Sequence, residues 1–439
     1  MRIAELRLHP VAIADPPLRS SYGRHAPYAL RTIVELVSDE GVTGIGETYG
    51  GEGPLAALEA ARDRIVGRDP FQLTGFWMDL AARTAQETAA VAGGHSHTYL
   101  LPGENPLDRD ARTFAAIEIA CLDLIGKALG KPVCDLLGGR ARDQVDFSAY
   151  LFYKHAGGGG AGADAREDEY GEVLKPRAMV REARQMIAQY GFREIKLKGG
   201  VLDPALEIAT IRALREEFGP GYPLRIDPNS AWSPATSIEV GRALKEELSG
   251  GGYLEDPAAG LDGMAEVRRG LLAEDNGTPL ASNVAVTCFN DVPKAWRLDA
   301  VQIVLSDPHY WGGLRSVQHL ARMCDAMGLG VSMHSNNHLG VSLMAMAHAA
   351  AASPYFTHAC DTHYPWQTAE DEVVAGGRVP IVNGAVRIPD RPGLGVDLDY
   401  DQLARGRERY EKNPYRKRDD EAEMRRHVDP NWRRILPRW

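Results

Sequence analysis

The chain has 439 residues and a formal net charge of −10, and its 44% hydrophobic and 25% charged residues are ordinary for a globular protein. The acidic balance disfavours a nucleic-acid partner, and no apolar run is long enough to span a membrane. The five cysteines are scattered without a C-x-x-C pair, and charges interrupt the first residues. We therefore expect a cytoplasmic protein without a signal peptide.

The start of the chain predicts two strand regions. Residues 2–9 and 32–49 have strand-like patterns, and turn residues at 39–41 indicate that the second run folds as a hairpin. The stretch 20–31 between them has no periodicity. We interpret it as an exposed loop.

A long helical pattern follows these strands. Apolar residues recur at helical spacing over 113–137, and the glycine pair at 138–139 is expected to end the helix. Strands followed by helices are typical of an α+β module. We expect residues 1–140 to form an α+β capping and lid domain.

After this module the pattern becomes a repeat. Short apolar runs that end in polar residues and precede helix-like sequence occur eight times. The polar residues are spaced 24 to 31 residues apart: Lys196, Asp227, Glu255, Asn283, Asp307, His334 and His363. That spacing suits a strand, a helix and two loops. The repeat predicts an α/β fold, a (β/α)8-type (modified TIM) barrel over 141–395, with its active site where the strands end.

Two further segments lie outside this repeat. The Gly-rich insert around 156–163 follows the first barrel strand, and we expect it to form a mobile loop at the barrel mouth. Residues 396–439 are expected to pack back on the capping domain.

Three polar residues on consecutive strands suggest a metal site. Any one of Asp227, Glu255 and Asn283 is more often a strand end or a helix cap. Together, at matching positions, they favour a hard divalent cation, Mg²⁺ first and manganese as its substitute. Asp256 and Asn229 would then support these ligands or face the substrate.

Lys196 and Lys198 are two residues apart in a strand, so both side chains point to one face. Their mutual repulsion and a nearby cation disfavour the charged forms, which can leave one lysine neutral enough to act as a base. The alternatives are two exposed lysines at a strand end or a Schiff-base lysine. The latter does not need a metal site beside it.

Asp307 and His334 end the next two strands after the metal triplet. A carboxylate beside His334 would fix its tautomer and raise its basicity, and the simpler alternative is a histidine that only bonds locally. A zinc helix is excluded because Ser335 stands where the H-E-x-x-H motif needs glutamate. A cation between two bases, Lys198 and His334, suits removal of a proton alpha to a carboxylate.

Seven short motifs of the barrel region resemble those of a known enzyme family. In order, "KLKGG", "RIDPNSAW", "LEDP", "SN", "SDPHYW", "HSNNH" and "DTHYPWQ" resemble the glucarate dehydratase group of the enolase superfamily, from the loop "HAPY" to the tail "RDD". The resemblance implies Lys198 and His334 as bases and Asp307 as the partner that orients His334. It implies Asp227, Glu255 and Asn283 as Mg²⁺ ligands. It also implies residues that bind the diacid: His25, Tyr150, Lys196, Asn229, Asn336, His363 and Arg418.

The resemblance also implies a reaction. The group converts D-glucarate, and L-idarate, to 5-keto-4-deoxy-D-glucarate by removing the C5 proton and expelling the 4-hydroxyl. The partner is then a small dicarboxylic acid sugar, with no nucleic acid or membrane, and we expect a homo-oligomer. The segment "LPGENPLDRDARTF" departs from the threonine-bearing stretch of the group. The alternatives are a dehydratase or epimerase for another hexarate such as galactarate, and a weakly active or non-catalytic paralogue.

Overall fold

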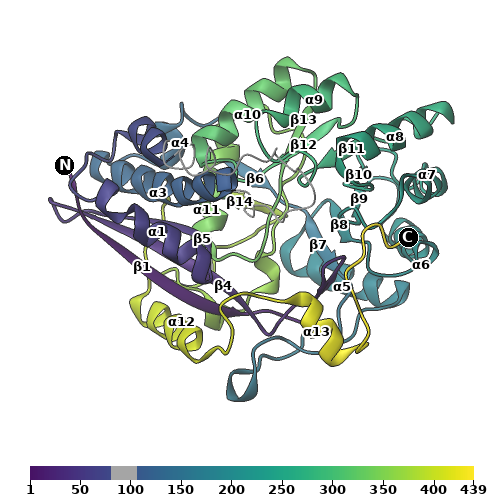
Figure 1. Cartoon of the computed structure of the whole chain (residues 1–439), viewed down its shortest axis with the longest axis horizontal. Helices are drawn as coiled ribbons and strands as arrows, with labels where there is room; N and C mark the ends of the chain where they lie inside the picture. The colour runs from purple at the N-terminus through teal and green to yellow at the C-terminus, as the bar shows by residue number, and fades with distance from the viewer. Residues whose placement is uncertain (81–105) are drawn as a thin grey trace.

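The computed structural model describes residues 1–80 and 106–439, which fold into a capping module and a barrel (Figure 1). The capping module contains an antiparallel three-stranded sheet in the order β1–β4–β5. Its strands are β1 (Ile3–Ala14), β4 (Tyr28–Ser38) and β5 (Thr43–Tyr49), and the helices beside it are α1 (Glu52–Ile65) and α3 (Pro106–Leu129). Apolar side chains of the sheet and of α3, such as Ile33, Ile45 and Ile117, are buried together. The free thiol of Cys121 lies among them.

The predicted hairpin is confirmed. β4 and β5 pair antiparallel, with Glu35 opposite Ile45. In the turn, the backbone N–H of Gly41 donates to the carbonyl of Ser38 at 3.0 Å. Gly41 has a φ of +80°, a left-handed conformation that favours glycine.

The expectation of an exposed loop at 20–31 is wrong. β2 (Arg19–Ser20) pairs with β3 (Gly23–Arg24), and β4 already begins at Tyr28. His25 within the stretch is only 4% exposed. The C-terminal segment covers this hairpin so closely that a Cβ atom on Gly23 would lie 2.3 Å from the carbonyl oxygen of Asp420. A segment more than 390 residues away therefore determines its burial.

The helix expected over 113–137 is two helices. α3 ends at Leu129, and Gly130 follows with a φ of +66°. Pro132 then precedes the short helix α4 (Val133–Leu136). Left-handed glycine stops the first helix, and proline, which lacks an N–H, prevents its continuation.

The second part is a parallel barrel sheet. Its strand order β7 to β13 follows the chain, as in a (β/α)8-type barrel. The strands are β7 (Ala149–Phe152), β8 (Ile195–Lys198), β9 (Leu224–Asp227), β10 (Tyr253–Glu255), β11 (Leu280–Ser282), β12 (Ile303–Ser306) and β13 (Gly330–Met333). Seven of the eight predicted runs thus form strands of one sheet, which confirms the predicted fold class.

The eighth run closes the barrel without forming a named strand. Cys360 makes a parallel bridge with Phe147, at the start of the first run. The N–H of Cys360 donates to the carbonyl of Asp146 at 2.9 Å, and the N–H of Asp361 donates to that of Met333 at 2.8 Å. Residues 360–361 therefore join the last strand, β13, to the start of the first run.

Helices follow the strands and surround the sheet (Figure 1). They are α5 (Pro176–Tyr190), α6 (Pro204–Phe218), α7 (Pro234–Ala243), α8 (Gly260–Ala273), α9 (Asp291–Arg297), α10 (Leu314–Ala326) and α11 (Gly340–Ala351). Proline begins α5, α6 and α7, where its missing N–H costs nothing. Asp203 and Ser233 cap α6 and α7 by accepting backbone N–H bonds. No helix within the described ranges is long and apolar enough to cross a membrane.

The remaining elements are short or C-terminal. They are β6 (Gln144–Asp146), β14 (Ala385–Arg387), η1 (Gly162–Asp164), η2 (Tyr364–Trp366), η3 (Ala369–Asp371), α12 (Tyr400–Lys412) and α13 (Asp420–His427). In the C-terminal segment, Arg409 Nε donates to the carbonyl of Ala12, and Tyr415 Oη donates to that of Tyr28. The last residue instead contacts the barrel, because the Trp439 carbonyl accepts from the N–H of Ser233 at 2.6 Å.

The Gly-rich insert is fastened at several points, contrary to the expectation of a mobile loop. The N–H of Gly160 donates to the carbonyl of Pro27 at 2.8 Å, and the N–H of Ala161 donates to Tyr28 Oη at 3.0 Å. Tyr28 Oη in turn donates to Asp164 Oδ2. A Cβ atom on Gly159 would lie 2.5 Å from the backbone of Asp15. The glycines therefore allow the insert to pack closely against the capping module.

A buried ion pair joins the capping sheet to the barrel. Arg31 on β4 donates to Glu47 on β5 at 2.7 Å, and both side chains are at most 2% exposed. Glu47 also accepts from the N–H groups of Leu339 and Ser342, at the start of α11. Burial opposes ionisation of Glu47, but Arg31, with help from His338 and the Leu339 N–H, lowers the pKa of this carboxyl below its usual value. The start of α11 is thereby bonded to the capping module.

We predict that Arg31→Met lowers the free energy of unfolding by about 3–5 kcal/mol, because Glu47 is left as an uncompensated buried charge. The double variant Arg31→Met with Glu47→Gln should recover part of this loss, since no buried charge remains. Denaturant unfolding of both variants beside the wild type measures the difference. Equal stability of Arg31→Met and the wild type would contradict the prediction.

Candidate active site

The predicted strand-end residues meet at one end of the barrel. Lys196 and Lys198 lie on β8, Asp227 and Glu255 end β9 and β10, and Asn283 directly follows β11. All five are at most 6% exposed. The strands are parallel neighbours, so their carboxyl ends lie at the same edge of the sheet.

The two lysines contact three carboxylates and share Asp227, whose Oδ2 lies 3.3 Å from Lys196 Nζ. Lys198 Nζ lies 2.6 Å from Asp227 Oδ2. Lys196 Nζ lies 2.7 Å from Glu255 Oε1 and 2.6 Å from Asp361 Oδ2. Burial works against the charged Lys196, but Asp361 and Glu255 outweigh it and raise its pKa well above the usual value. These contacts favour the charged form of Lys196, and the expectation that one of the two lysines is neutral enough to act as a base stays a prediction.

Asp227 and Glu255 are neighbouring buried carboxyl groups. Burial and the negative charge of Asp227 raise the pKa of Glu255 well above its usual value. Burial also opposes ionisation of Asp227, but Lys198 and Lys196 outweigh it and lower the pKa of Asp227. Two like charges this close need a further positive charge before both groups ionise.

The oxygen atoms of Glu255 and Asn283 are placed as ligands of a divalent cation would be. Glu255 Oε2 is buried and has no hydrogen-bond partner among the residues that the structure describes. One terminal atom of the Asn283 amide lies 3.1 Å from Glu255 Oε1 and 3.0 Å from Asp256 Oδ2, and the other lies 3.2 Å from His334 Nε2. Hydrogen bonding alone would turn the amide nitrogen toward the carboxylates, whereas a cation there would attract the amide oxygen. Carboxylate and amide oxygens suit Mg²⁺ or a similar hard ion.

Asp256 supports the Asn283 loop. Its carboxylate accepts from Ser282 Oγ at 2.5 Å and from the N–H groups of Asn283 and Val284 at 2.8 and 3.0 Å. Burial, the largest influence, raises the pKa of Asp256 to about 6. With these donors around it, Asp256 holds the Asn283 backbone in place.

Asn229 supports Asp227 in a similar way, because its N–H and Nδ2 both donate to Asp227 Oδ1, at 3.0 and 2.9 Å. Asn229 and Asp256 have positive φ angles of 45° and 40°. Non-glycine residues rarely adopt this conformation, and such strain concentrates at functional sites.

The predicted pair of Asp307 and His334 is formed. Asp307 directly follows β12, and its Oδ2 lies 2.9 Å from His334 Nδ1. Burial would raise the pKa of Asp307, but the imidazoles of His309 and His334 hold it well below its usual range. The ionised Asp307 accepts from His334 Nδ1, so Nε2 of His334 remains on the side that faces Asn283.

Aromatic rings line the side of the site next to the lysines. The ring centre of Tyr150 on β7 lies 4.6 Å from Lys196 Nζ and 4.7 Å from the ring of His363. Phe152 packs against His363 at 5.1 Å and against His25 at 6.1 Å. Burial, helped by His25 and His334, lowers the pKa of His363 well below its usual value, so this ring is neutral. Tyr150, Lys196, His363 and His25 are thus contiguous.

His25 and Arg418 meet on one carboxylate that the sequence did not point to. Asp15 Oδ2 lies 3.0 Å from His25 Nδ1 and 3.2 Å from Arg418 Nη1. Asp15 Oδ1 accepts from Asn337 Nδ2 at 3.0 Å. Arg418 also pairs with Asp420 at 2.8 Å. The structure therefore connects Arg418 to the site through Asp15, and its guanidinium is already shared between two acids.

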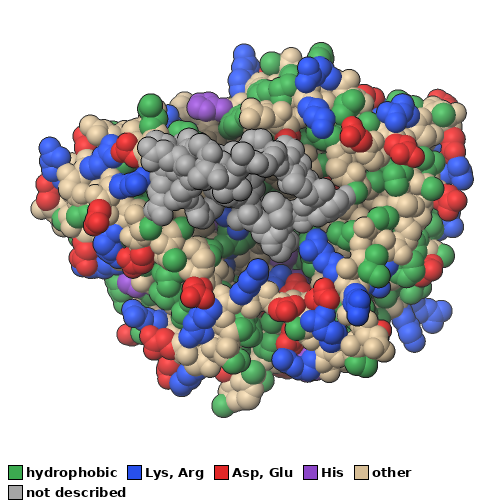
Figure 2. Space-filling model, viewed as in Figure 1, with side chains coloured by type: hydrophobic (Ala, Val, Ile, Leu, Met, Phe, Trp, Pro, Cys, Tyr) green, Lys and Arg blue, Asp and Glu red, His purple; other side chains and the backbone are tan. Residues whose placement is uncertain are grey.

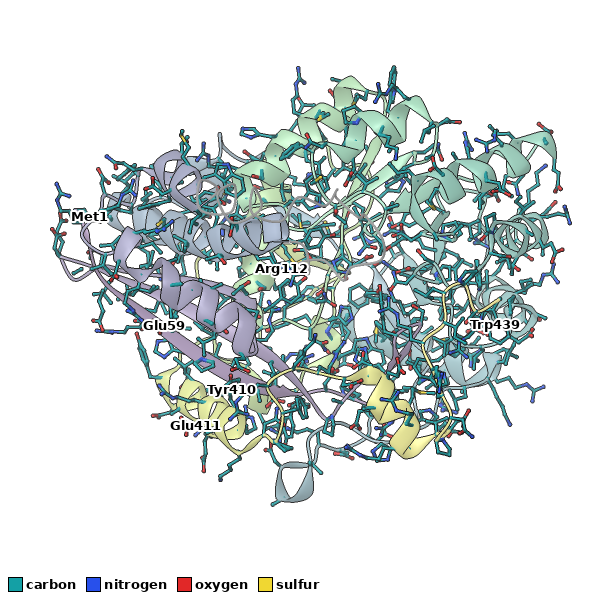
Figure 3. The ribbon with its side chains drawn as sticks, viewed as in Figure 1. Met1, Glu59, Arg112, Tyr410, Glu411 and Trp439 are labelled. Atoms are coloured by element: carbon teal, nitrogen blue, oxygen red, sulfur yellow. The ribbon has the colours of Figure 1, made fainter. Side chains whose placement is uncertain are left out.

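Asn336 lies on a different edge of the site. Its Nδ2 donates to Tyr49 Oη at 3.1 Å. The Tyr49 ring lies under the guanidinium groups of Arg112, at 4.2 Å, and Arg31, at 5.0 Å. Arg112 is labelled in Figure 3, near the barrel end of α3. Arg112 belongs to the departing segment "LPGENPLDRDARTF", and residues 101–105 of that segment lie outside the described residues.

Sequence reasoning missed four residues of this site: Asp15, Tyr49, His309 and Asp361. Asp361 carried a usable signal, because it is a polar residue at the end of the eighth apolar run. His309 is two residues from Asp307 in "SDPHYW", a motif that was recognised without assigning the histidine. Asp15 and Tyr49 belong to the capping module and have no repeat to mark them.

Known protein families match both parts of the chain. The description "Enolase C-terminal domain-like" matches residues 178–402, and "Mandelate racemase / muconate lactonizing enzyme, N-terminal domain" matches residues 4–138. A relative from Streptomyces coelicolor, named probable glucarate dehydratase, is 46% identical over 443 residues, which cover 100% of this chain and 99% of the relative.

Solved structures agree with these matches. An enolase from Pseudomonas fluorescens with bound magnesium, potassium and tartrate has a TM-score of 0.91 and 46% identity, covering 100% of this chain and 99% of that one. An enolase from Thermobispora bispora, complexed with magnesium and formate, has a TM-score of 0.88 and 48% identity, with 100% of both chains covered. The chain therefore belongs to the enolase superfamily, in the branch of mandelate racemase and muconate lactonizing enzyme.

Proposed function

We propose that this chain is a magnesium-dependent acid-sugar dehydratase that acts on D-glucarate and L-idarate. The observation that carries the proposal is the placement of two proton-transfer groups around one set of oxygen ligands. Lys198 lies on β8 and His334 follows β13, and the strands that carry Asp227, Glu255 and Asn283 lie between them in the sheet.

Asp227, Glu255 and Asn283 would hold Mg²⁺. When bound, the ion supplies positive charge beside the substrate carboxylate, which stabilises the negative charge that develops on proton removal. The structures from Pseudomonas fluorescens and Thermobispora bispora contain magnesium, which supports this assignment.

Lys198 and His334 are the proposed bases. His334, oriented by Asp307, takes a proton from the carbon next to the carboxylate through Nε2, and the electron pair of the broken C–H bond moves toward that carboxylate. The hydroxyl on the adjacent carbon then leaves, and His334 returns the proton so that water is released. Lys198 would take the proton from the opposite face of the same carbon.

The other residues would bind the diacid. Lys196 is held charged by Asp361 and Glu255, so we assign it to a substrate carboxylate and not to proton transfer. Neutral His363, Tyr150, Asn229 and Asn336 would contact hydroxyl groups. Figure 2 shows basic and acidic side chains interspersed over the viewed face. The net charge of the chain is negative, so cations within the site, among them His25 and Arg418, would recognise the dianion.

Two observations support the assignment of the substrate. The relative from Streptomyces coelicolor is named probable glucarate dehydratase, and the structure from Pseudomonas fluorescens binds tartrate, a dicarboxylate with two hydroxyls. Another hexarate such as galactarate, or epimerisation by the same bases, remains the alternative within the class. The contacts of Lys198 and of the Asp307–His334 pair argue against a non-catalytic paralogue. Turnover of a panel of hexarates with Mg²⁺ tests the assignment.

Three expectations from the sequence remain predictions here: a homo-oligomeric state, a cytoplasmic location and the lack of a nucleic-acid partner. The division into segments 1–140, 141–395 and 396–439 is likewise proposed.

We predict that EDTA abolishes activity and that Mg²⁺ restores it. Glu255→Gln should lose activity by about 10²-fold or more, because charge stabilisation at the reacting carboxylate is weakened. Asn283→Asp is the matched control, since it keeps an oxygen ligand, whereas Asn283→Leu should lose Mg²⁺ binding. Calorimetric titration with Mg²⁺ measures binding apart from activity. A rigorously metal-free protein that turns over normally would refute the ligand set.

We further predict that each of the two bases acts on a different substrate. His334→Asn should lose dehydration of D-glucarate by about 10²–10⁴-fold, the usual contribution of a general base, and should lose its C5 proton exchange in D₂O. The same variant should still exchange the C5 proton of L-idarate through Lys198. Lys198→Ala should show the reverse pattern by NMR. Equal loss of both exchanges in both variants, with Mg²⁺ binding intact, would be incompatible with the two-base arrangement.

A further inference from the structure

Asp307 bonds a second imidazole besides that of His334. Its Oδ1 lies 2.7 Å from His309 Nδ1 and accepts from the His309 backbone N–H at 2.8 Å. Its Oδ2 lies 2.9 Å from His334 Nδ1. All three side chains are at most 7% exposed. One carboxylate thus lies between two buried histidines, and only His334 faces the ligand set.

The other side of the His309 ring contacts a serine at the start of α11. His309 Nε2 lies 2.7 Å from Ser342 Oγ, which also accepts from Arg31 Nη2 at 3.2 Å. An ionised carboxylate only accepts, so His309 Nδ1 carries a hydrogen and donates it to Asp307 Oδ1.

This series of hydrogen bonds ends on the capping sheet. Arg31 pairs with Glu47, and Glu47 accepts from the N–H of Ser342 at 2.9 Å. Ser342 is therefore fixed through its side chain and its backbone by the same ion pair. The order of contacts is Asp307, His309, Ser342 and then Arg31 with Glu47.

We propose that His309 is a positioning residue for the His334 base. It holds the Asp307 carboxylate in the orientation that sets the His334 ring, and it fixes that carboxylate to the Arg31–Glu47 pair of the capping sheet. The inference rests on the proposed function only in that His334 removes a proton.

The consequence is confined to one face of the substrate. Lys198 contacts Asp227, the member of the ligand set on the strand farthest in the sheet from the Asp307 strand. Loss of the His309–Asp307 contact therefore impairs proton removal by His334 and leaves removal by Lys198 intact. A residue that only fills space in the core would affect both faces together, because a general loosening does not select a base.

Two substitutions separate the two contacts of the His309 ring. His309→Asn places an amide N–H near the position of Nδ1, so it keeps the bond to Asp307 and loses Ser342. His309→Gln reaches the position of Nε2, so it keeps Ser342 and loses Asp307. Both replacement side chains are polar, and neither is larger than histidine in volume. The melting temperature of the full chain shows whether each variant folds.

The experiment measures C5 proton exchange of D-glucarate and of L-idarate in D₂O with Mg²⁺ present. We expect His309→Gln to lose about 10- to 100-fold in exchange of D-glucarate, the usual cost of removing a group that orients a functional side chain, while exchange of L-idarate is retained. His309→Asn should retain most of both exchanges. Ser342→Ala, which leaves the His309–Asp307 contact in place, should reduce exchange of D-glucarate less than His309→Gln does.

Three results would overturn the inference: equal loss on both substrates, equal behaviour of the Asn and Gln variants, or no loss in His309→Gln. If His309→Gln does not fold, His309→Phe, which keeps a ring and lacks the N–H toward Asp307, takes its place, because selective loss on D-glucarate supports the inference and loss on both substrates or on neither refutes it. A wild-type protein that exchanges neither substrate would instead refute the proposed function. The two failures are therefore distinguishable.

Discussion

The structure depends on balancing buried charge at the barrel mouth. Asp227, Glu255 and Asp361 are fully buried, and burying carboxylates is costly unless cations and hydrogen bonds compensate them. Lys196 and Lys198 compensate part of this charge from the neighbouring strand. Burial and the charge of Asp227 raise the pKa of Glu255, and a divalent cation beside it would favour its ionised form.

The capping module supplies the rest of the site's polar partners. The barrel strands present their ends to an open mouth, so the side chains there need contacts from outside the barrel. Asp15 connects His25 with Arg418, Tyr49 accepts from Asn336, and the Arg31–Glu47 pair bonds the start of α11. A change in the capping sheet therefore reaches the His334 side of the site without touching the substrate.

Several predictions failed for one physical reason. Residues 20–31 lack periodicity, yet the C-terminal segment buries them, and the Gly-rich insert is held by the capping module. Both outcomes depend on contacts between distant segments, and local patterns carry no information about such contacts.

The sequence by itself determined the order of the barrel strands and the polar residue that ends each one. Strand periodicity is local, and parallel strands taken in chain order bring their carboxyl ends to one edge, so Asp227, Glu255, Asn283, Asp307 and His334 were found without coordinates. Only the tertiary structure decided which groups pair, such as Asp307 with His309 and Asp15 with Arg418. Pairing depends on distances of about 3 Å between atoms that the chain brings together only when it is fully folded.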